Sequence, residues 1–262
     1  MAHRQGRITA SNVHKVLHAK TPQAALKYAM MDETRSLDAV PAVKWGRDHE
    51  PVAKETFMAY MESNHKDFIF ENTGLVLHED FPFLAASPDG LFKCSCHPPG
   101  CLEIKCPFKY RDTEPTSEQA LLDKDYCLDD KGHLKTGHAY YSQVQTQMAV
   151  TKTGLCAFLV WTPKGCTITH VSRDELFIGK LMDEVKEFVV NHLIPELLIR
   201  KLRNEAALPE HHTSLPVCKC KRPSFGKMIQ CGSGKCETEW FHYECVELVR
   251  KPRGKWLCSD CS

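Results

Sequence analysis

The chain has 262 residues, a length that suits one large domain or a medium domain with a small one attached. Hydrophobic residues make up 42% of the sequence, as in a soluble protein with a core, and the lack of any apolar run long enough to cross a bilayer argues against a membrane-spanning protein. The formal net charge is +1 and residues 215–262 are the basic part, so nucleic-acid binding by the rest would need a local basic patch.

Helical periodicity and start signals predict three helices in the first quarter of the chain, with Pro51 near the start of the third: residues 9–20, 22–31 and 45–61. Short runs rich in β-branched and aromatic residues then predict five strands: residues 67–74, 75–80, 82–87, 89–94 and 101–106.

A polar, loop-like stretch follows at residues 112–137, in which residues 130–132 predict a hairpin turn. Beyond it the pattern predicts a helix, two strands and a long final helix: residues 138–151, 154–162, 166–172 and 174–203. Strands in the middle of the chain with helices on either side predict an α/β or α+β fold with a central mixed sheet.

Fourteen cysteines are unevenly spread, and seven of them lie in the last 45 residues. Their clustering at zinc-ligand spacings indicates reduced thiols. Residues 1–11 also lack the apolar core of a signal peptide. We therefore expect an intracellular protein.

The C-terminal cysteines form part of a set of eight metal ligands in four close pairs. In chain order the set is Cys218, Cys220, Cys231, Cys236, His242, Cys245, Cys258 and Cys261. Eight such ligands satisfy two tetrahedral Zn²⁺ sites. A segment this short cannot bury enough apolar surface to fold alone, so we expect two Zn²⁺ ions to supply its folding energy.

The ligand order, with Trp256 two residues before the seventh ligand, closely resembles a plant homeodomain (PHD) finger. Many such fingers read a histone tail, and the subgroup most similar to this one holds trimethyl-lysine in an aromatic cage. The cage positions retained here are Ser224, Met228 and Trp240. Val217 stands where that subgroup has an aromatic residue, and Gly232, Ser233 and Gly234 replace its acidic residues. The resemblance therefore implies a weakened histone reader in the nucleus, with a structural or DNA-assisting role as the alternative.

A second polar set lies between Ser87 and Phe108. Asp89 lies in a turn that enters a strand, and Glu103 and Lys105 alternate along a strand, so both face the same side. Two carboxylates on adjacent strands can share a hard divalent ion, and a neighbouring lysine can orient or deprotonate an attacking water. This is the phosphodiester chemistry of PD-(D/E)xK nucleases, although an exposed Glu-x-Lys pair on a strand face is the commoner explanation of such a match.

Further motifs occur in the order typical of the lambda exonuclease family, which includes the YqaJ-type viral recombinases. They are RITAS (7–11), KWGRDHE (44–50), SPDG (87–90), EIKCPF (103–108), YRD (110–112) and HAYYSQVQ (138–145). The sequence thus resembles this family over nearly all of residues 1–203. The resemblance implies a restriction-endonuclease-like fold, Mg²⁺ (or Mn²⁺) as cofactor, double-stranded DNA as substrate and a homotrimer.

The same resemblance implies two groups of site residues. The active site would comprise Glu50, Asp89, Glu103, Lys105 and Gln143, with the carbonyl of Ile104 completing the metal shell. A pocket for a 5′-phosphate would comprise Arg4, Ser11, Ser87 and Arg111. Taken singly, each residue has an ordinary alternative, such as a helix cap, a turn former or a surface charge.

Cysteines between the two catalytic strands depart from the family pattern. The stretch Cys94, Cys96, His97 and Cys101 could bind a further zinc. Its spacing is tighter than in usual zinc knuckles and favours a hairpin tip with reduced thiols.

We therefore predict a nuclease domain at residues 1–206, a linker at 207–216 and a zinc finger at 217–262. The predicted function is Mg²⁺-dependent 5′-to-3′ degradation of linear duplex DNA from phosphorylated ends, with the finger binding a histone tail or another protein. One alternative is a catalytically silent scaffold that binds DNA or chromatin. The other is an endonuclease that uses the same core.

Overall fold

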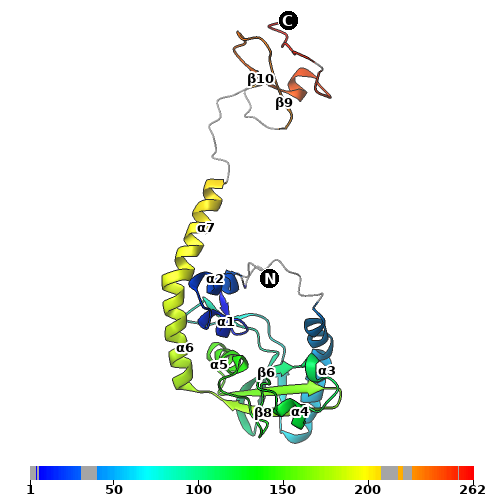
Figure 1. Ribbon diagram of the computed structural model, residues 1–262, viewed down its shortest axis with the longest axis vertical. Coiled ribbons are helices and arrows are strands. Elements are labelled where there is room, and N and C mark those ends of the chain that lie inside the picture. The colour runs from blue at the N-terminus through cyan, green and yellow to red at the C-terminus, as the bar shows by residue number, and fades with distance from the viewer. Residues whose placement is uncertain (1–3, 5, 31–39, 208–217, 221–225, 253) are drawn as a thin grey trace. The chain divides into compact units, whose positions relative to one another are not determined.

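The computed structural model describes residues 4, 6–30, 40–207, 218–220, 226–252 and 254–262 (Figure 1). The chain divides into two compact units, Met1–Leu198 and Ile199–Ser262. Among the helices within the described ranges, none is long and apolar enough to cross a membrane.

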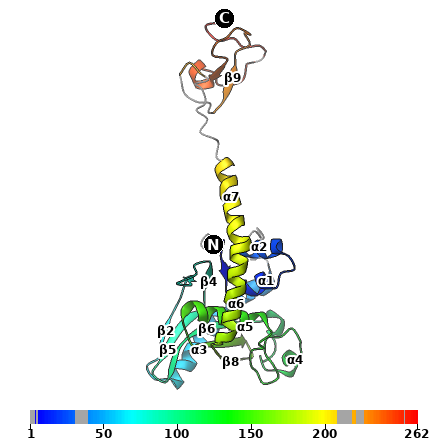
Figure 2. The ribbon, with the colours of Figure 1, turned by 90° about the vertical axis from the view of Figure 1, so that its left-hand side faces the viewer.

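A five-stranded sheet forms the centre of the first unit (Figures 1 and 2). In spatial order its strands are β2 (Ile69–Glu71), β5 (Gly90–Cys94), β6 (His97–Lys105), β7 (Leu155–Thr162) and β8 (Gly165–Ser172). The β6–β7 pair is parallel and the other three pairs are antiparallel. Apolar residues run almost without interruption along β7 because both of its faces are buried. The predicted mixed sheet is confirmed.

Two helices cover opposite faces of this sheet. α3 (Pro41–Asn64) packs against the face that carries Leu102, and α5 (Ala139–Thr151) packs against the face that carries Cys101. Consecutive side chains of β6 point to opposite faces, so β6 contributes to the core under both helices.

α3 begins earlier than the sequence predicts. It starts at Pro41 rather than at Trp45, so Pro51 lies inside the helix and not near its start. A proline in a helix interior lacks the N–H of one helical hydrogen bond. The helix continues beyond it because the following turns bury Ala53 and Phe57 against the sheet.

A three-stranded sheet accompanies the N-terminal helices. β1 (Ile8–Thr9) pairs in parallel with β4 (Leu84–Ala86), which pairs antiparallel with β3 (Val76–Leu77). Three helices share a core with this sheet, namely α1 (Val13–Leu17), α2 (Pro22–Met30) and α6 (Glu175–Phe188).

The predicted final helix is interrupted by one π-helical segment. Val189–Leu193 joins α6 to α7 (Ile194–Ala207). Pro195 lies in the first turn of α7, and its missing N–H is the physical reason for the altered hydrogen-bond pattern before it.

The connection between β6 and α5 is more buried than its polarity suggests. It contains η3 (Phe108–Tyr110) and α4 (Glu118–Leu121). A bridge between Leu128 and Leu134 closes the predicted hairpin, in which Gly132 has a φ of 77°. Both leucines are buried in the core beneath α5, so a few apolar residues anchor an otherwise polar stretch.

The second unit holds a small antiparallel hairpin. β9 (Met228–Gln230) pairs with β10 (Trp240–His242), and η5 (Tyr243–Val246) follows. Apart from Ile229 and Phe241, the buried apolar residues described in this unit are cysteines. So small an apolar core does not stabilise a fold without a further contribution.

Candidate active site and metal-ligand clusters

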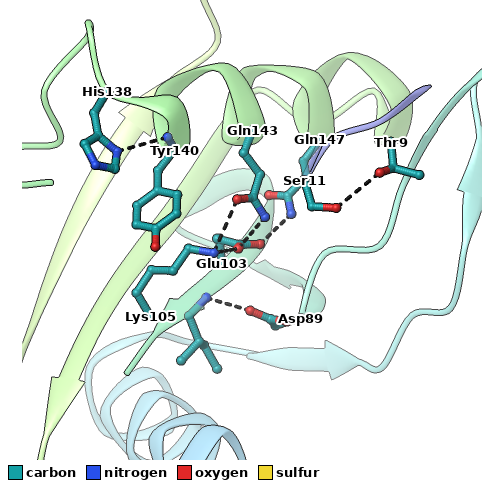
Figure 3. Close-up of polar contacts among 10 residues, drawn as sticks. Thr9, Ser11, Asp89, Glu103, Lys105, His138, Tyr140, Gln143 and Gln147 are labelled. Carbon is teal, nitrogen blue, oxygen red and sulfur yellow. Dashed lines mark hydrogen bonds and ion pairs between the residues drawn. The ribbon is translucent and has the colours of Figure 1, made fainter. Parts of the chain in front are cut away.

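The carboxylate of Glu103 is the polar centre of the first unit (Figure 3). Glu103 lies on the α5 face of β6 and is only 3% exposed. Its Oε1 accepts hydrogen bonds from Lys105 Nζ at 2.5 Å and Gln143 Nε2 at 2.6 Å, and its Oε2 accepts one from Gln147 Nε2 at 2.5 Å. Three donors offset the cost of burying this carboxylate and fix its orientation.

Gln147 belongs to this site but was missed by sequence reasoning. It is fully buried and lies one helical turn after Gln143, on the same face of α5. The four-residue spacing between Gln143 and Gln147 indicates that they share one face of the helix. Gln145 lies between them in the sequence but not on that face. The Gln145 amide instead donates to the carbonyl of Ser172, on the other side of the helix.

Asp89 approaches the site from the turn before β5. Its backbone N–H donates to the Leu102 carbonyl at 2.9 Å. Its Oδ2 accepts a hydrogen bond from the Ile104 N–H at 2.6 Å (Figure 3). Burial, with the negative charge of Glu103 as the next cause, raises the pKa of Asp89 to about 8. Two carboxylates held this close disfavour a second negative charge unless a cation joins them. This donor set fits a hard divalent ion.

Lys105 is held as an ammonium ion at the same site. Its Nζ lies 2.5 Å from Glu103 Oε1 and 4.2 Å from the centroid of the Tyr140 ring. Burial lowers the pKa of Lys105, but Glu103 and Tyr140 outweigh burial and leave the pKa above its usual value. A charged ammonium can orient a water or a phosphate oxygen, and this state is unsuited to removing a proton.

Glu50 lies on α3, the helix that covers the opposite face of the sheet. With Ile104, Lys105 and Tyr140 it lines a cavity of about 460 Å³. Its side chain is 45% exposed and its Oε1 lies 4.0 Å from Lys54 Nζ. The structure thus brings Glu103, Lys105 and Gln143 into direct contact, joins Asp89 through the Ile104 backbone, and places Glu50 on the cavity wall.

Three of the four predicted phosphate-pocket residues lie together next to this site. Arg4, Ser11 and Ser87 line a small cavity of about 60 Å³, along with Gln143 and Gln147. Arg4 Nη2 donates to Ser87 Oγ at 2.8 Å, across 83 positions of sequence. A guanidinium and two hydroxyl groups are suitable donors for a phosphate.

Arg111, the fourth predicted residue, is placed elsewhere. It is not among the residues described as lining the small cavity. Its Nη1 donates to the Phe108 carbonyl at 2.9 Å, and its guanidinium lies 4.3 Å from the Phe108 ring centroid. Asp112 lies 3.5 Å from its Nε.

The eight predicted ligands of the second unit form two groups. One consists of Cys218, Cys220, His242 and Cys245, and the other of Cys231, Cys236, Cys258 and Cys261. In each group the ligand atoms lie within 4.8 Å of one another. The groups alternate along the chain, so each one ties together distant segments. A backbone hydrogen bond from Cys258 lowers the pKa of Cys231 to about 7, which favours the thiolate that zinc requires.

Two predicted cage residues lie on the paired strands of this unit. Met228 is half-buried on β9, and Trp240 is 41% exposed on β10. Ser224 and Val217 lie outside the described residues. A Cβ atom at Gly232 would lie 2.4 Å from Lys255 Cγ, so an acidic side chain at that position would require Lys255 to move.

Comparisons with known proteins assign the two parts separately. The model of the YqaJ-like viral recombinase domain matches residues 1–154. The fold is similar to the crystal structure of an alkaline exonuclease, LHK-Exo, from Laribacter hongkongensis, with 26% identity over 79% of this chain and 96% of that one and a TM-score of 0.56. The complex of LHK-Exo with dAMP matches over the same shares with a TM-score of 0.58.

The finger is similar to chromatin-related proteins. It is 54% identical over 44 residues to the chromatin modification-related protein YNG2 of Candida glabrata, which is 17% of this chain and 16% of that protein. It is 53% identical over 45 residues to inhibitor of growth protein 4 of Gallus gallus, which is 17% of this chain and 18% of that protein. The chain therefore spans about a sixth of the length of the curated relatives it matches.

These matches agree with the two folds described above. The second unit has the homology of an inhibitor-of-growth-type PHD finger. The first unit has an alkaline exonuclease-like fold, and since the family model covers more than half of the sequence, the chain belongs to the family of the YqaJ-like viral recombinase domain.

Proposed function

We propose that the first unit is a metal-dependent deoxyribonuclease that degrades linear duplex DNA in the 5′-to-3′ direction. The observation that carries the proposal is the buried Glu103 carboxylate, held by Lys105, Gln143 and Gln147 beside Asp89. A catalytically silent scaffold would have no chemical reason to bury these charges in one place. We also propose a homotrimer, from the resemblance to the lambda exonuclease family. From the resemblance to PHD fingers we propose that the chain acts in the nucleus.

Asp89, Glu103, Glu50 and the Ile104 carbonyl would hold Mg²⁺ or Mn²⁺. When bound, such an ion stabilises charge on the phosphate and lowers the pKa of a water ligand. The protein supplies the rest of the chemistry through positioning. Lys105 orients the attacking water and a phosphate oxygen, while Gln143 and Gln147 keep Glu103 in one orientation.

End-labelled duplex DNA tests the proposal directly. We expect shortening of linear duplexes with Mg²⁺ and none with EDTA. Covalently closed circles should survive, because an exonuclease needs a terminus. Cleavage of closed circles would instead support the endonuclease, and DNA binding without cleavage would support the scaffold.

The small cavity leads to a prediction about DNA ends. We expect faster digestion from 5′-phosphorylated than from 5′-hydroxyl ends, because Arg4, Ser11 and Ser87 offer donors to a phosphate. Arg4→Ala should reduce this preference by roughly tenfold or more, since a hydrogen bond to a charged group contributes about 1.5–3 kcal/mol. Initial rates on the two kinds of duplex measure it.

Arg111→Ala is the informative comparison. Its guanidinium already contacts Phe108 and Asp112, so we expect it to affect the preference less than Arg4→Ala does. A larger effect at Arg111 would show that it moves into the pocket when DNA binds. Equal rates on both kinds of end in the unchanged protein would rule out the pocket.

For the finger we propose weak binding to a histone tail or another protein. Trp240 presents an exposed ring for a methylated lysine, but Val217 offers no aromatic face. A cation–π contact contributes about 0.5–2 kcal/mol, so Val217→Tyr should tighten binding of a trimethyl-lysine tail peptide by roughly twofold to thirtyfold. Calorimetry measures it, with Trp240→Ala as the non-binding control. Micromolar or tighter binding by the unchanged chain would contradict the expected weakness.

A further inference from the structure

Four metal-binding side chains meet at the tip of the β5–β6 hairpin, away from the proposed catalytic centre. They are His65, Cys94, Cys96 and His97, and their ligand atoms all lie within 4.8 Å of one another. Cys94 Sγ lies 3.5 Å from Cys96 Sγ and 3.6 Å from His97 Nδ1. His65 Nδ1 lies 3.3 Å from Cys96 Sγ and 3.7 Å from Cys94 Sγ.

These separations match a tetrahedral zinc site. With zinc bonds of about 2.3 Å to sulfur and about 2.05 Å to nitrogen, tetrahedral angles place two sulfurs about 3.8 Å apart and a sulfur and a nitrogen about 3.6 Å apart. The finger of this same chain shows the same spacing, with 3.7 Å between Cys236 Sγ and Cys258 Sγ and 3.3 Å between Cys220 Sγ and His242 Nδ1. The hairpin tip is therefore built like the two expected zinc sites.

The backbone places the ligands from three directions. His65 follows α3 in an extended conformation (φ −128°, ψ 142°). Cys94 ends β5 and pairs with His97 at the start of β6, beside an irregularity in the ladder. The N–H of Ser95 donates to the carbonyl of Lys66 at 2.9 Å, which fastens the hairpin turn to the chain that leaves α3.

The fourth ligand differs from Cys101, which completed the zinc alternative that the sequence left open. Cys101 is fully buried on β6, opposite Cys156 of β7, and does not belong to the cluster. His65 takes its place. The tight spacing that argued against a zinc knuckle is therefore no objection, because one ligand comes from outside the hairpin.

We propose that His65, Cys94, Cys96 and His97 form a third zinc site, of the Cys₂His₂ type. Two thiolates and two neutral imidazoles would neutralise the ion and close its coordination, as in structural rather than catalytic zinc sites. The site would fasten the hairpin that carries Asp89 and Glu103 to the helix that carries Glu50. It does not rest on the proposed nuclease activity.

Zinc content of the full chain tests the proposal. Elemental analysis of protein purified from zinc-containing medium should give three zinc ions per chain. The double variant Cys94→Ser/Cys96→Ser should give two. Cys166→Ser is the matched control, because Cys166 is an exposed thiol at the opposite end of the sheet, paired with Trp161, and this variant should keep three.

Two further measurements distinguish the loss of a zinc site from misfolding of the variant. His65→Asn removes the ligand outside the hairpin and should also give two ions, with an unchanged circular dichroism spectrum and a lower unfolding midpoint. In the unchanged protein, Cys94 and Cys96 should resist alkylation until a chelator is added, whereas Cys166 should react at once. Two zinc ions in the unchanged chain, three in the double variant, or immediate alkylation of Cys94 and Cys96 would each overturn the proposal.

Discussion

Asp89→Asn and Glu103→Gln are each expected to lower DNA cleavage by about a thousandfold or more while the protein stays folded. Each change removes a charged ligand from the proposed metal site, and metal stabilisation of transition-state charge contributes several kcal/mol. At Glu103 the amide nitrogen of a glutamine would also face donors from Lys105, Gln143 and Gln147. Single-turnover digestion of labelled duplex DNA measures the loss.

Folding should survive Asp89→Asn because the carboxylates of Asp89 and Glu103 repel each other. The raised pKa of Asp89 reflects burial and the nearby charge of Glu103, so removing one charge relieves an unfavourable interaction. Thermal unfolding in EDTA should show a midpoint that is unchanged or higher for Asp89→Asn. Glu79→Gln, which alters an exposed carboxylate paired with Lys152, is the control and should cleave normally.

Lys105→Ala separates positioning from metal binding. It should abolish turnover but retain Mn²⁺ binding by calorimetry, because Lys105 is not a proposed ligand. Near-normal turnover by either carboxylate variant would contradict the site assignment. Loss of metal binding by Lys105→Ala would show that the ammonium also holds the ligands in place.

Cys231→Ser or His242→Ala should unfold the finger and leave the first unit folded. Structural zinc contributes about 10–16 kcal/mol of apparent folding free energy in such domains, far more than the apolar core described here can supply. Each change removes a ligand from a different group of four. Because the two groups alternate along the same segment of the chain, loss of either zinc ion should unfold the whole finger. Limited proteolysis should then remove residues 218–262.

Two readouts distinguish this result from general misfolding. Zinc content should fall, and the rate of DNA digestion per chain should stay within about twofold, as for surface changes away from a site. Cys166→Ser should alter neither. A protease-resistant finger without zinc would show that packing alone stabilises it.

Much of the candidate site could be predicted because it follows strand and helix periodicity. The alternation of Glu103 and Lys105 on one strand required that both face the same helix, and the structure places them against α5. Periodicity within one element could not identify His65, which lies 29 residues before Cys94 and meets it only through the end of α3. Gln147 was missed because a buried amide resembles any other polar residue on a helix until its partner is known.

The stretch at residues 112–137 was predicted only in part. It is loop-like with a hairpin, as its polarity and turn residues indicate, but Leu128 and Leu134 are buried under α5, which polarity does not indicate. A few apolar anchors outweigh a polar average, because each buried leucine contributes about 1.5–3 kcal/mol. The start of α3 was missed although Pro41 stands at its first position, where a proline suits a helix.

The parallel pairing of β6 with β7 has a consequence for the order in which the protein folds. The β5–β6 hairpin is local in sequence and can form within microseconds, whereas β6 must wait for β7 across the whole segment from Cys106 to Gly154. Closing such a long connection costs entropy before any contact repays it, so this pairing is expected late. During synthesis, Asp89 and Glu103 also leave the ribosome before Gln143 and Gln147 of α5, because they come earlier in the chain. A growing chain would therefore lack the complete proposed active site until β6 and β7 have paired.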